Sequence, residues 1–179
     1  MLPSLLMRTS FFLFVAALLF GASSEARADQ AVFSVEARGE VISGESRVFG
    51  GPGLGAELGY AFDVHPVVYV MPEVSVTGAV YLSSPVTGGF RGTGGVQVGV
   101  TAEVQPSAYF HVGYGGFAGK ASKFGPKDLA HSFTLDAGLS IDKLVERSFS
   151  VGGSIGYQGF LGDVNAHGVA FGFHVVFWL

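Results

Sequence analysis

Residues 53–64, GLGAELGYAFDV, decide the fold of this 179-residue chain because their side chains alternate strictly in character. Large or apolar side chains occupy every second position, and glycine, alanine, glutamate and aspartate occupy the positions between them. The apolar set is Leu54, Ala56, Leu58, Tyr60, Phe62 and Val64. A period of two residues is the period of a β-strand, and no helical period competes with it here.

The same alternation recurs along the rest of the chain. Residues 96–104, 133–141 and 169–179 repeat it clearly, and looser versions lie at 30–42, 67–81, 107–117 and 149–161. Together with residues 53–64, these segments predict eight strands and an all-β fold.

The connections between the predicted strands alternate in length. Tight turns are expected around His65-Pro66 and Gln105-Pro106, where proline stands at positions that need no ladder donor. The joins at 43–52, 82–91 and 118–130 are longer and rich in glycine, serine and proline. Short turns at one rim and longer loops at the other predict an antiparallel up-and-down meander of eight strands, closed into a single barrel domain.

The composition restricts the class of protein further. Only 13% of the residues are charged, 28 are glycine, and no cysteine is present. An aromatic content of 13% and a net charge of -4 argue against a disordered chain and against a basic surface for nucleic acid. The absence of cysteine excludes a disulfide scaffold, a thiolate metal site and a lipid-anchoring cysteine in this sequence.

The first 28 residues have the pattern of a secretory signal peptide. Arg8 supplies a positive charge, residues 11–22 form an apolar run, and Ala26-Arg27-Ala28 fits the cleavage pattern. The apolar run is too short for a membrane helix, which needs about 20 residues. We therefore expect residues 1–28 to be removed and residues 29–179 to form the barrel domain.

The polar face of the strands indicates which side of the barrel meets water. It carries mostly glycine, serine, threonine and alanine with scattered carboxylates, a composition that suits the cramped interior of an eight-stranded barrel better than a soluble surface. The apolar face is then expected to meet lipid, with aromatic residues near both ends of the strands. The expected aromatic girdles are Tyr60, Phe62, Phe149 and Phe177 at the turn end, and Tyr114, Phe117, Phe133 and Tyr157 at the loop end.

On these features the chain resembles the small bacterial outer-membrane β-barrels of the OmpA, OmpX and opacity-protein type. Aromatic-glycine units such as Gly59-Tyr60-Ala61-Phe62 and Gly113-Tyr114-Gly115-Gly116-Phe117 support the resemblance, as does a final strand that ends with the chain. The resemblance implies a bacterial outer-membrane location and recognition of the C-terminal strand by the barrel-assembly machinery. Family members usually end on phenylalanine, whereas this chain ends Phe177-Trp178-Leu179, so Phe177 is the candidate for the aromatic role.

The predicted lumen collects most of the charged side chains of the strands, and a buried carboxylate must be paired or neutralised. The predicted polar set is Glu36, Arg38, Glu40, Glu57, Glu73, Glu103, His111, Asp136, Ser154 and His174. Reflecting each hairpin about its connection predicts the pairs Arg38 with Glu57, Glu57 with Glu73, His111 with Asp136, Ser154 with His174, and His174 with Glu36. Either some of the carboxyl groups are protonated, or water and hydroxyl groups share their charge.

His111, Asp136 and Ser154 also have the residue types of an acyl-transfer triad, but a hydrogen-bonded lumen network is the favoured interpretation, because composition alone does not establish the geometry of a nucleophile. His131-Ser132 resembles the His and Ser of a lipid A deacylase only weakly, because the usual His-x-Ser-Asn order is missing. Lys120, Lys123 and Lys127 could contact lipopolysaccharide phosphates, although a solvated loop is the simpler interpretation. No metal or cofactor site is predicted.

These observations predict an integral outer-membrane barrel with a largely filled lumen and an envelope-structural or surface-interaction role. Membrane lipid and lipopolysaccharide are its expected partners, and nucleic acid is not. Two alternatives remain open at this point, namely an enzyme that modifies outer-membrane lipids and a narrow pore that prefers cations.

Overall fold

The computed structural model describes residues 30–44, 47–82, 87–119 and 130–179, and these residues form eight β-strands. The predicted signal peptide and the three lysines Lys120, Lys123 and Lys127 lie outside the described residues. The strands are β1 (Gln30–Gly44), β2 (Arg47–His65), β3 (Val68–Tyr81), β4 (Thr87–Val100), β5 (Val104–Gly119), β6 (Ala130–Glu146), β7 (Phe149–Gly162) and β8 (Ala166–Trp178). The described part contains no helix long and apolar enough to cross a membrane.

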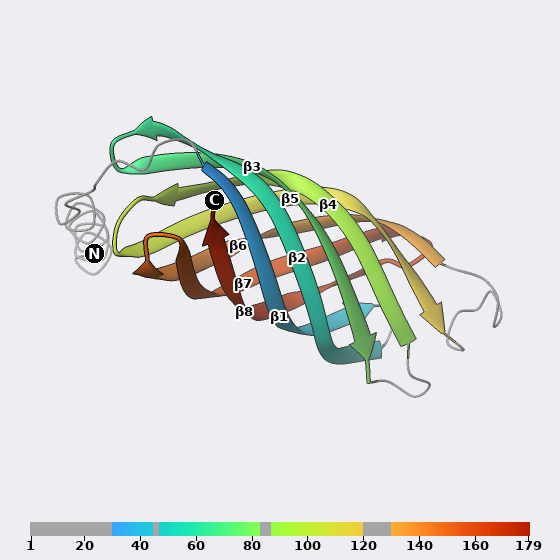
Figure 1. The fold of residues 1–179 in the computed structure, drawn as a ribbon. Coiled ribbons are helices and arrows are strands. Elements are labelled where there is room, and N and C mark those ends of the chain that lie inside the picture. Colours follow the sequence, from blue (N-terminus) through green and yellow to red (C-terminus); the bar gives the residue numbers. More distant parts are fainter. Residues whose placement is uncertain (1–29, 45–46, 83–86, 120–129) are drawn as a thin grey trace, which may run out of the picture.

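Each strand pairs antiparallel with its neighbour in sequence, and β8 pairs back onto β1, so the sheet is a closed barrel (Figure 1). The stagger of the strands follows from the register. Starting at Ser34 and stepping from partner to partner through all eight strands leads to Gly44, which lies ten residues further along β1. Such a stagger tilts the strands against the barrel axis, as Figure 1 shows. The predicted eight-stranded up-and-down barrel is confirmed.

Two of the predicted long connections prove to be largely strand. β1 continues to Gly44 and β2 begins at Arg47, so most of the predicted loop 43–52 is paired sheet, and β4 begins at Thr87 within the predicted loop 82–91. Pro52 is tolerated in β2 because it lies just beyond the last ladder pair of β2 with β3, Gly53 with Ala79. The glycine content that suggested loops belongs to the wall of the barrel.

One predicted turn is also misplaced. Gln105 and Pro106 lie inside β5, and the connection from β4 to β5 is formed by residues 101–103. The turn after His65 is where the sequence predicts it. Proline at Pro106 is accepted because it lies just beyond the last ladder pair of β5 with β4, Ser107 with Gly99, so its missing N–H interrupts no ladder there.

The predicted inner and outer faces agree with the exposure of the side chains, with two exceptions. Leu54 is 68% exposed and Phe173 is 77% exposed on the outer wall, whereas Ser150 is fully buried in the lumen. Phe117 is a correction, because it is only 7% exposed and packs inside the barrel instead of joining the loop-end girdle. Glu103 is the other, because it lies exposed in the turn and not in the lumen.

Three layers of side chains fill the lumen. An apolar cluster at the loop end and a second one at the turn end enclose a polar middle layer. The loop-end cluster contains Ile42, Ala79, Tyr81, Phe117, Ala130, Phe160 and Ala166. The turn-end cluster contains Val32, Ala61, Tyr69, Met71, Val176 and Trp178. The polar residues are therefore shielded from both rims.

Inward-facing tyrosines explain why glycine occupies several positions of the inner wall. A side chain at Gly99 would collide with the ring of Tyr69, and one at Gly138 or Gly156 would collide with Tyr109. Aromatic rings that cover glycines in this way fill the lumen without widening the barrel. The polar middle layer is positioned by this packing.

Candidate functional site

The half of the polar layer that lies nearer the loops, called the loopward half below, is organised around the carboxylate of Glu40. Arg91 Nη2 lies 3.0 Å from Glu40 Oε1, Arg38 Nε lies 3.1 Å from the same oxygen, and the hydroxyl of Tyr81 donates to Oε2 at 2.7 Å. The side chain of Glu40 is completely buried. Its charge is therefore balanced by two guanidinium groups, as a buried carboxylate requires.

Asp136 and Gln158 complete this half of the layer. Arg91 Nε lies 3.3 Å from Asp136 Oδ2. The amide oxygen of Gln158, in the orientation that satisfies its neighbours, accepts from the guanidinium groups of both Arg38 and Arg91. The two arginines are thus held between acceptors on β1, β6 and β7.

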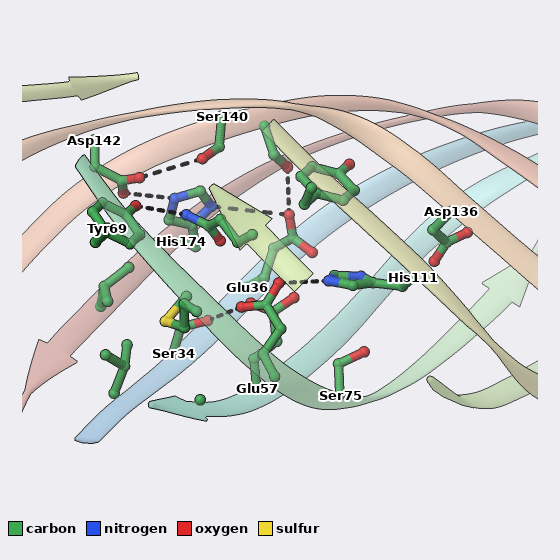
Figure 2. Close-up of a pocket in the computed structure, with 18 of the residues that line it drawn as sticks. Ser34, Glu36, Glu57, Tyr69, Ser75, His111, Asp136, Ser140, Asp142 and His174 are labelled. Carbon is green, nitrogen blue, oxygen red and sulfur yellow. Dashed lines mark hydrogen bonds and ion pairs between the residues drawn. The ribbon is translucent and has the colours of Figure 1, made fainter. Parts of the chain in front are cut away.

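The half of the polar layer that lies nearer the turns, called the turnward half below, contains carboxylates paired with histidines. His111 Nε2 lies 2.5 Å from Glu73 Oε1, and His174 Nε2 lies 2.7 Å from Asp142 Oδ1. His174 Nδ1 is 4.0 Å from Glu36 Oε1, so Asp142, His174 and Glu36 follow one another in a row, as Figure 2 shows. Arg38 Nη1 lies 3.3 Å from Glu36 Oε2 and connects this row to the loopward half.

Serine hydroxyls donate to two carboxylates of the layer. Ser154 donates to Glu36 Oε1 at 2.6 Å, and Ser34 donates to Glu57 Oε2 at 3.1 Å. No ion pair joins Glu57 to an arginine within the described strands. Glu57 also has two other carboxylates, Glu73 and Glu36, as electrostatic neighbours. Glu57 is therefore the least compensated charge in the layer.

The structure brings together nine of the ten residues of the predicted polar set, all except Glu103, but three of the five predicted pairs are wrong. His111 is opposite Asp136 and His174 is opposite Glu36, as predicted. Arg38 is opposite Gly53, and Glu57 is opposite Ser75 instead of Glu73. The third wrong pair is Ser154 with His174, because Ser154 is opposite Gly172. Every error is an even shift in register, which preserves the face of the side chain and changes its partner.

The error for Arg38 follows from the misplaced loop, whereas the error for Glu57 arises across the next turn, where β2 and β3 pair two residues away from the predicted register. The reflection placed the centre of the first connection too far into β2, because the ladder of β1 with β2 continues to Gly44 opposite Arg47. Arg38 accordingly finds its carboxylates on its own strand, at Glu36 and Glu40.

Three important residues of the layer are missing from the sequence prediction. Arg91 was assigned to a loop, Asp142 lies just past the predicted end of its strand, and Gln158 carries no charge that would mark it. Continuing the period of two from Asp136 through Gly138 and Ser140 leads to Asp142, and continuing it back from Thr93 leads to Arg91. The alternation of the strands, continued at the same phase, would therefore have placed Asp142 and Arg91 in the lumen.

A small cavity lies within the turnward half of the layer and extends to the turn-end cluster, and it has a volume of about 50 Å³. Glu73 Oε2 and Asp136 Oδ1 accept no hydrogen bond from the described protein atoms, and both residues line this cavity. A water molecule needs roughly 10–15 Å³ of such volume, so the cavity can hold a few water molecules that donate to these oxygens. It is far too small for a continuous aqueous channel.

The side chains of the possible triad are engaged with different partners. Ser154 donates to Glu36, His111 binds Glu73, and Asp136 binds Arg91. His131 and Ser132 point to opposite faces of β6, because His131 is exposed and Ser132 is buried and donates to the carbonyl oxygen of Val164. Neither set forms a nucleophile and base in contact. Within the described strands, no three acidic or histidine side chains converge on a point that could hold a metal ion.

No protein-family model matches the chain, and no curated protein matches it by sequence. Comparison with solved structures finds similar folds. Neisserial surface protein A superposes with a TM-score of 0.67 at 13% identity, covering 86% of this chain and all of that one. The outer-membrane enzyme PagL gives a TM-score of 0.58 at 11% identity, covering 80% of this chain and 97% of that one.

A third similar structure is Ail, the attachment invasion locus protein of Yersinia pestis, in complex with the heparin analogue sucrose octasulfate. It gives a TM-score of 0.56 at 13% identity and covers 86% of this chain and all of Ail. At such low identity, the likeness concerns the fold. The chain has the closed, eight-stranded architecture of the small bacterial outer-membrane β-barrels.

Proposed function

We propose that this protein is a non-enzymatic integral barrel of the outer membrane with an envelope-structural or surface-interaction role. The observation that supports it best is the filled lumen. Apolar clusters close both ends, and the ion pairs of Glu40, Arg38 and Arg91 occupy the space between them. A lumen packed in this way serves to stabilise the barrel, and contacts with the surroundings are left to the outer wall and the loops.

The proposal includes the route to the membrane. Residues 1–28 direct export and are removed, and the barrel begins at Asp29. β8 carries the assembly signal, with Phe177 on its outward face, 40% exposed. The contact of Lys120, Lys123 and Lys127 with lipopolysaccharide phosphates belongs to the same proposal and concerns residues outside the described strands.

A narrow cation-preferring pore is the second candidate, because one observation favours it. The polar layer contains six carboxyl side chains, Glu36, Glu40, Glu57, Glu73, Asp136 and Asp142, and two guanidinium groups, those of Arg38 and Arg91. An acidic lumen attracts cations. The two apolar clusters oppose conduction, because ions would have to pass through them without water.

Conductance separates the two candidates. Purified barrel reconstituted in a planar bilayer should show no steady current, and the barrel should meanwhile be verified as folded by its shifted mobility in unheated gels. A steady, cation-selective current would replace the first proposal by the second. Mass spectra of lipid A from cells with and without the protein should be identical, and a missing or added acyl chain would establish an enzyme instead.

Cells that lack the gene test the role itself. If the role is structural, the deletion strain should become sensitive to detergent, and a barrel with residues 120–129 replaced by a short glycine-serine linker should restore resistance. If the role is surface interaction, resistance should be unaffected, and adherence should depend on that loop. A deletion without effect on either measurement would overturn the proposal.

A further inference from the structure

The outer wall carries an apolar groove across β8, β1, β2 and β3. Its volume is about 990 Å³, open to the surroundings. Phe171 and Phe173 of β8 border one side, and Val80 and Leu82 border the other. Between them, the outward positions of β1 and β2 are Ala37, Gly39 and Val41, and Gly50, Pro52 and Leu54, so the floor of the groove is lowest at the small residues Gly50 and Pro52.

The borders of the groove are raised because their side chains are large and stand out from the wall. Phe173 is 77% exposed and Leu82 is 70% exposed. The ring of Phe171 lies over Gly39, where any side chain would collide with it. Among the described residues that line the groove, Arg38 and Glu40 carry charge, and both side chains are turned into the lumen and paired there. The groove therefore offers apolar contacts alone.

The position of the groove along the barrel indicates which part of the membrane it meets. Gly50 and Leu82 are hydrogen-bonded to each other at the loop end of the wall, and the groove extends from there to Phe173, nearer the middle of β8. In barrels of this architecture, longer loops lie outside the cell and short turns lie in the periplasm. The groove consequently faces the outer leaflet, whose lipid is lipopolysaccharide.

We propose that this groove binds an acyl chain of a lipopolysaccharide molecule. The wall around it lies in hydrocarbon, and an unfilled depression there would forfeit van der Waals contacts on its floor and both borders. An unbranched, flexible chain can follow the floor between the two ridges. A second copy of the barrel fits less well, because two convex barrels meet along a narrow strip and a stable protein interface buries about 1,200 Å² or more.

Two glycines of neighbouring strands provide a matched pair of variants. Gly78 lies on the edge of the groove, and Gly92 lies outside it on β4. Both face outward, and at each a new Cβ would have its nearest atom 3.9 Å away. Gly78→Leu should therefore fill part of the groove without disturbing the backbone, while Gly92→Leu adds the same side chain elsewhere.

The experiment uses methyl-labelled barrel in nanodiscs whose phospholipid acyl chains are deuterated, with protonated lipopolysaccharide added. Nuclear Overhauser contacts from lipopolysaccharide acyl protons should be several-fold stronger at Leu54, Val80 and Leu82 than at Leu139 and Ile155 on the other side of the wall. Gly78→Leu should abolish this preference and Gly92→Leu should keep it.

Three results would overturn the proposal. Equal contacts around the whole wall would indicate an unselective lipid annulus. The same preference with a protonated phospholipid in place of lipopolysaccharide would assign the site to another lipid. Contacts between differently labelled copies at Leu82 would identify a barrel dimer. The inference depends on the proposed outer-membrane location, but each of these results leaves a folded, non-conducting barrel unaffected and so is distinguishable from a failure of the proposed function.

Discussion

At the scale of single residues, one tight constraint in the barrel is the contact between an inward tyrosine and a glycine on the facing strand. The three atoms nearest to a Cβ added at Gly99 all belong to the ring of Tyr69. This ring cannot easily give way, because Gln97 donates to its hydroxyl at 2.9 Å and Trp178 packs against it with ring centroids 6.0 Å apart. Glycine at this position is a packing requirement.

Gly99→Ala should therefore lower the free energy of unfolding by about 1–3 kcal/mol, the usual cost of overpacking a tight core. The matched control is Gly92→Ala on the same strand, which faces outward into open space and should change stability by no more than about 0.5 kcal/mol. Urea unfolding of the barrel in lipid vesicles measures both values. Equal stability of the two variants would show that the ring of Tyr69 moves aside at no cost.

Two buried glutamates are expected to respond in opposite ways to the loss of their charge. Glu40 is bound by Arg38, Arg91 and Tyr81, so Glu40→Gln leaves two guanidinium groups without their shared carboxylate and should cost about 3–5 kcal/mol. Glu57 has only Ser34 as a donor and lies near other carboxylates, so Glu57→Gln should leave stability unchanged or raise it. Urea midpoints in the same vesicles compare them, and a larger loss for Glu57→Gln than for Glu40→Gln would contradict the charge assignment.

The sequence was sufficient to assign residues to a face, because facing depends only on parity. Glu36, His111 and His174 lie in the lumen as predicted, and the pairs His111 with Asp136 and His174 with Glu36 are correct. The remaining pairs required the register, which depends on where each turn falls. Glycine and proline at 50–53 predicted a loop, but glycine is also frequent at the inward positions of a narrow barrel, so the pattern did not distinguish the two.

At the scale of the strand, the facing of β8 can be tested with the single tryptophan of the chain. Trp178 is 7% exposed, packs in the turn-end cluster and has its indole nitrogen 3.2 Å from the hydroxyl of Ser150. A shift of one residue would turn it to the lipid and turn Phe177 inward. The environment of the Trp178 indole therefore reports which face of β8 is turned to the lumen.

We expect bromine-labelled lipids to leave the fluorescence of Trp178 almost unquenched, because the indole lies in the lumen. The control is a barrel in which Trp178→Phe is combined with Phe173→Trp, which moves the indole to the most exposed large side chain of the same strand. This variant should be quenched strongly. Comparable quenching of the two proteins would mean that the facing of β8 is reversed.

The strand limits show what a period of two cannot resolve. The alternation identified all eight strands, but it underestimated β2 and β6, which extend over 19 and 17 residues. The additional residues of β2 lie mostly toward the loops and those of β6 lie mostly toward the turn, and in both extensions glycine or charged residues interrupt the apolar pattern. Arg91 and Asp142 were missed for this reason, since both lie on strand extensions that the apolar signal does not cover.

At the scale of the whole molecule, the outer wall has exposed aromatic residues in two rings, and membrane barrels place such rings at the two interfaces. Tyr60, Phe62 and Phe177 lie exposed near the turns, and Tyr114, Phe133 and Tyr157 lie exposed near the loops. The charged layer of the lumen lies between these rings, at the height that the proposed outer-membrane location surrounds with hydrocarbon. The closed sheet has no free edge, and this allows it to span the membrane.

The stability of the barrel should consequently depend on the thickness of the bilayer. The apolar band of such barrels is about 25 Å tall, and a mismatch costs a fraction of a kcal/mol per Å. In a series of phosphatidylcholine vesicles of increasing acyl-chain length, the free energy of unfolding in urea should pass through a maximum where the hydrocarbon thickness matches the distance between the two aromatic rings.

Removing the loop-end ring with Tyr114→Ala and Tyr157→Ala should flatten this maximum, because these side chains anchor the wall at the interface. Phe110→Ala, which removes an exposed ring between the two girdles, should lower the whole curve and leave the position of its maximum unchanged. A stability that is independent of thickness would show that the two rings do not determine how the barrel sits in the membrane.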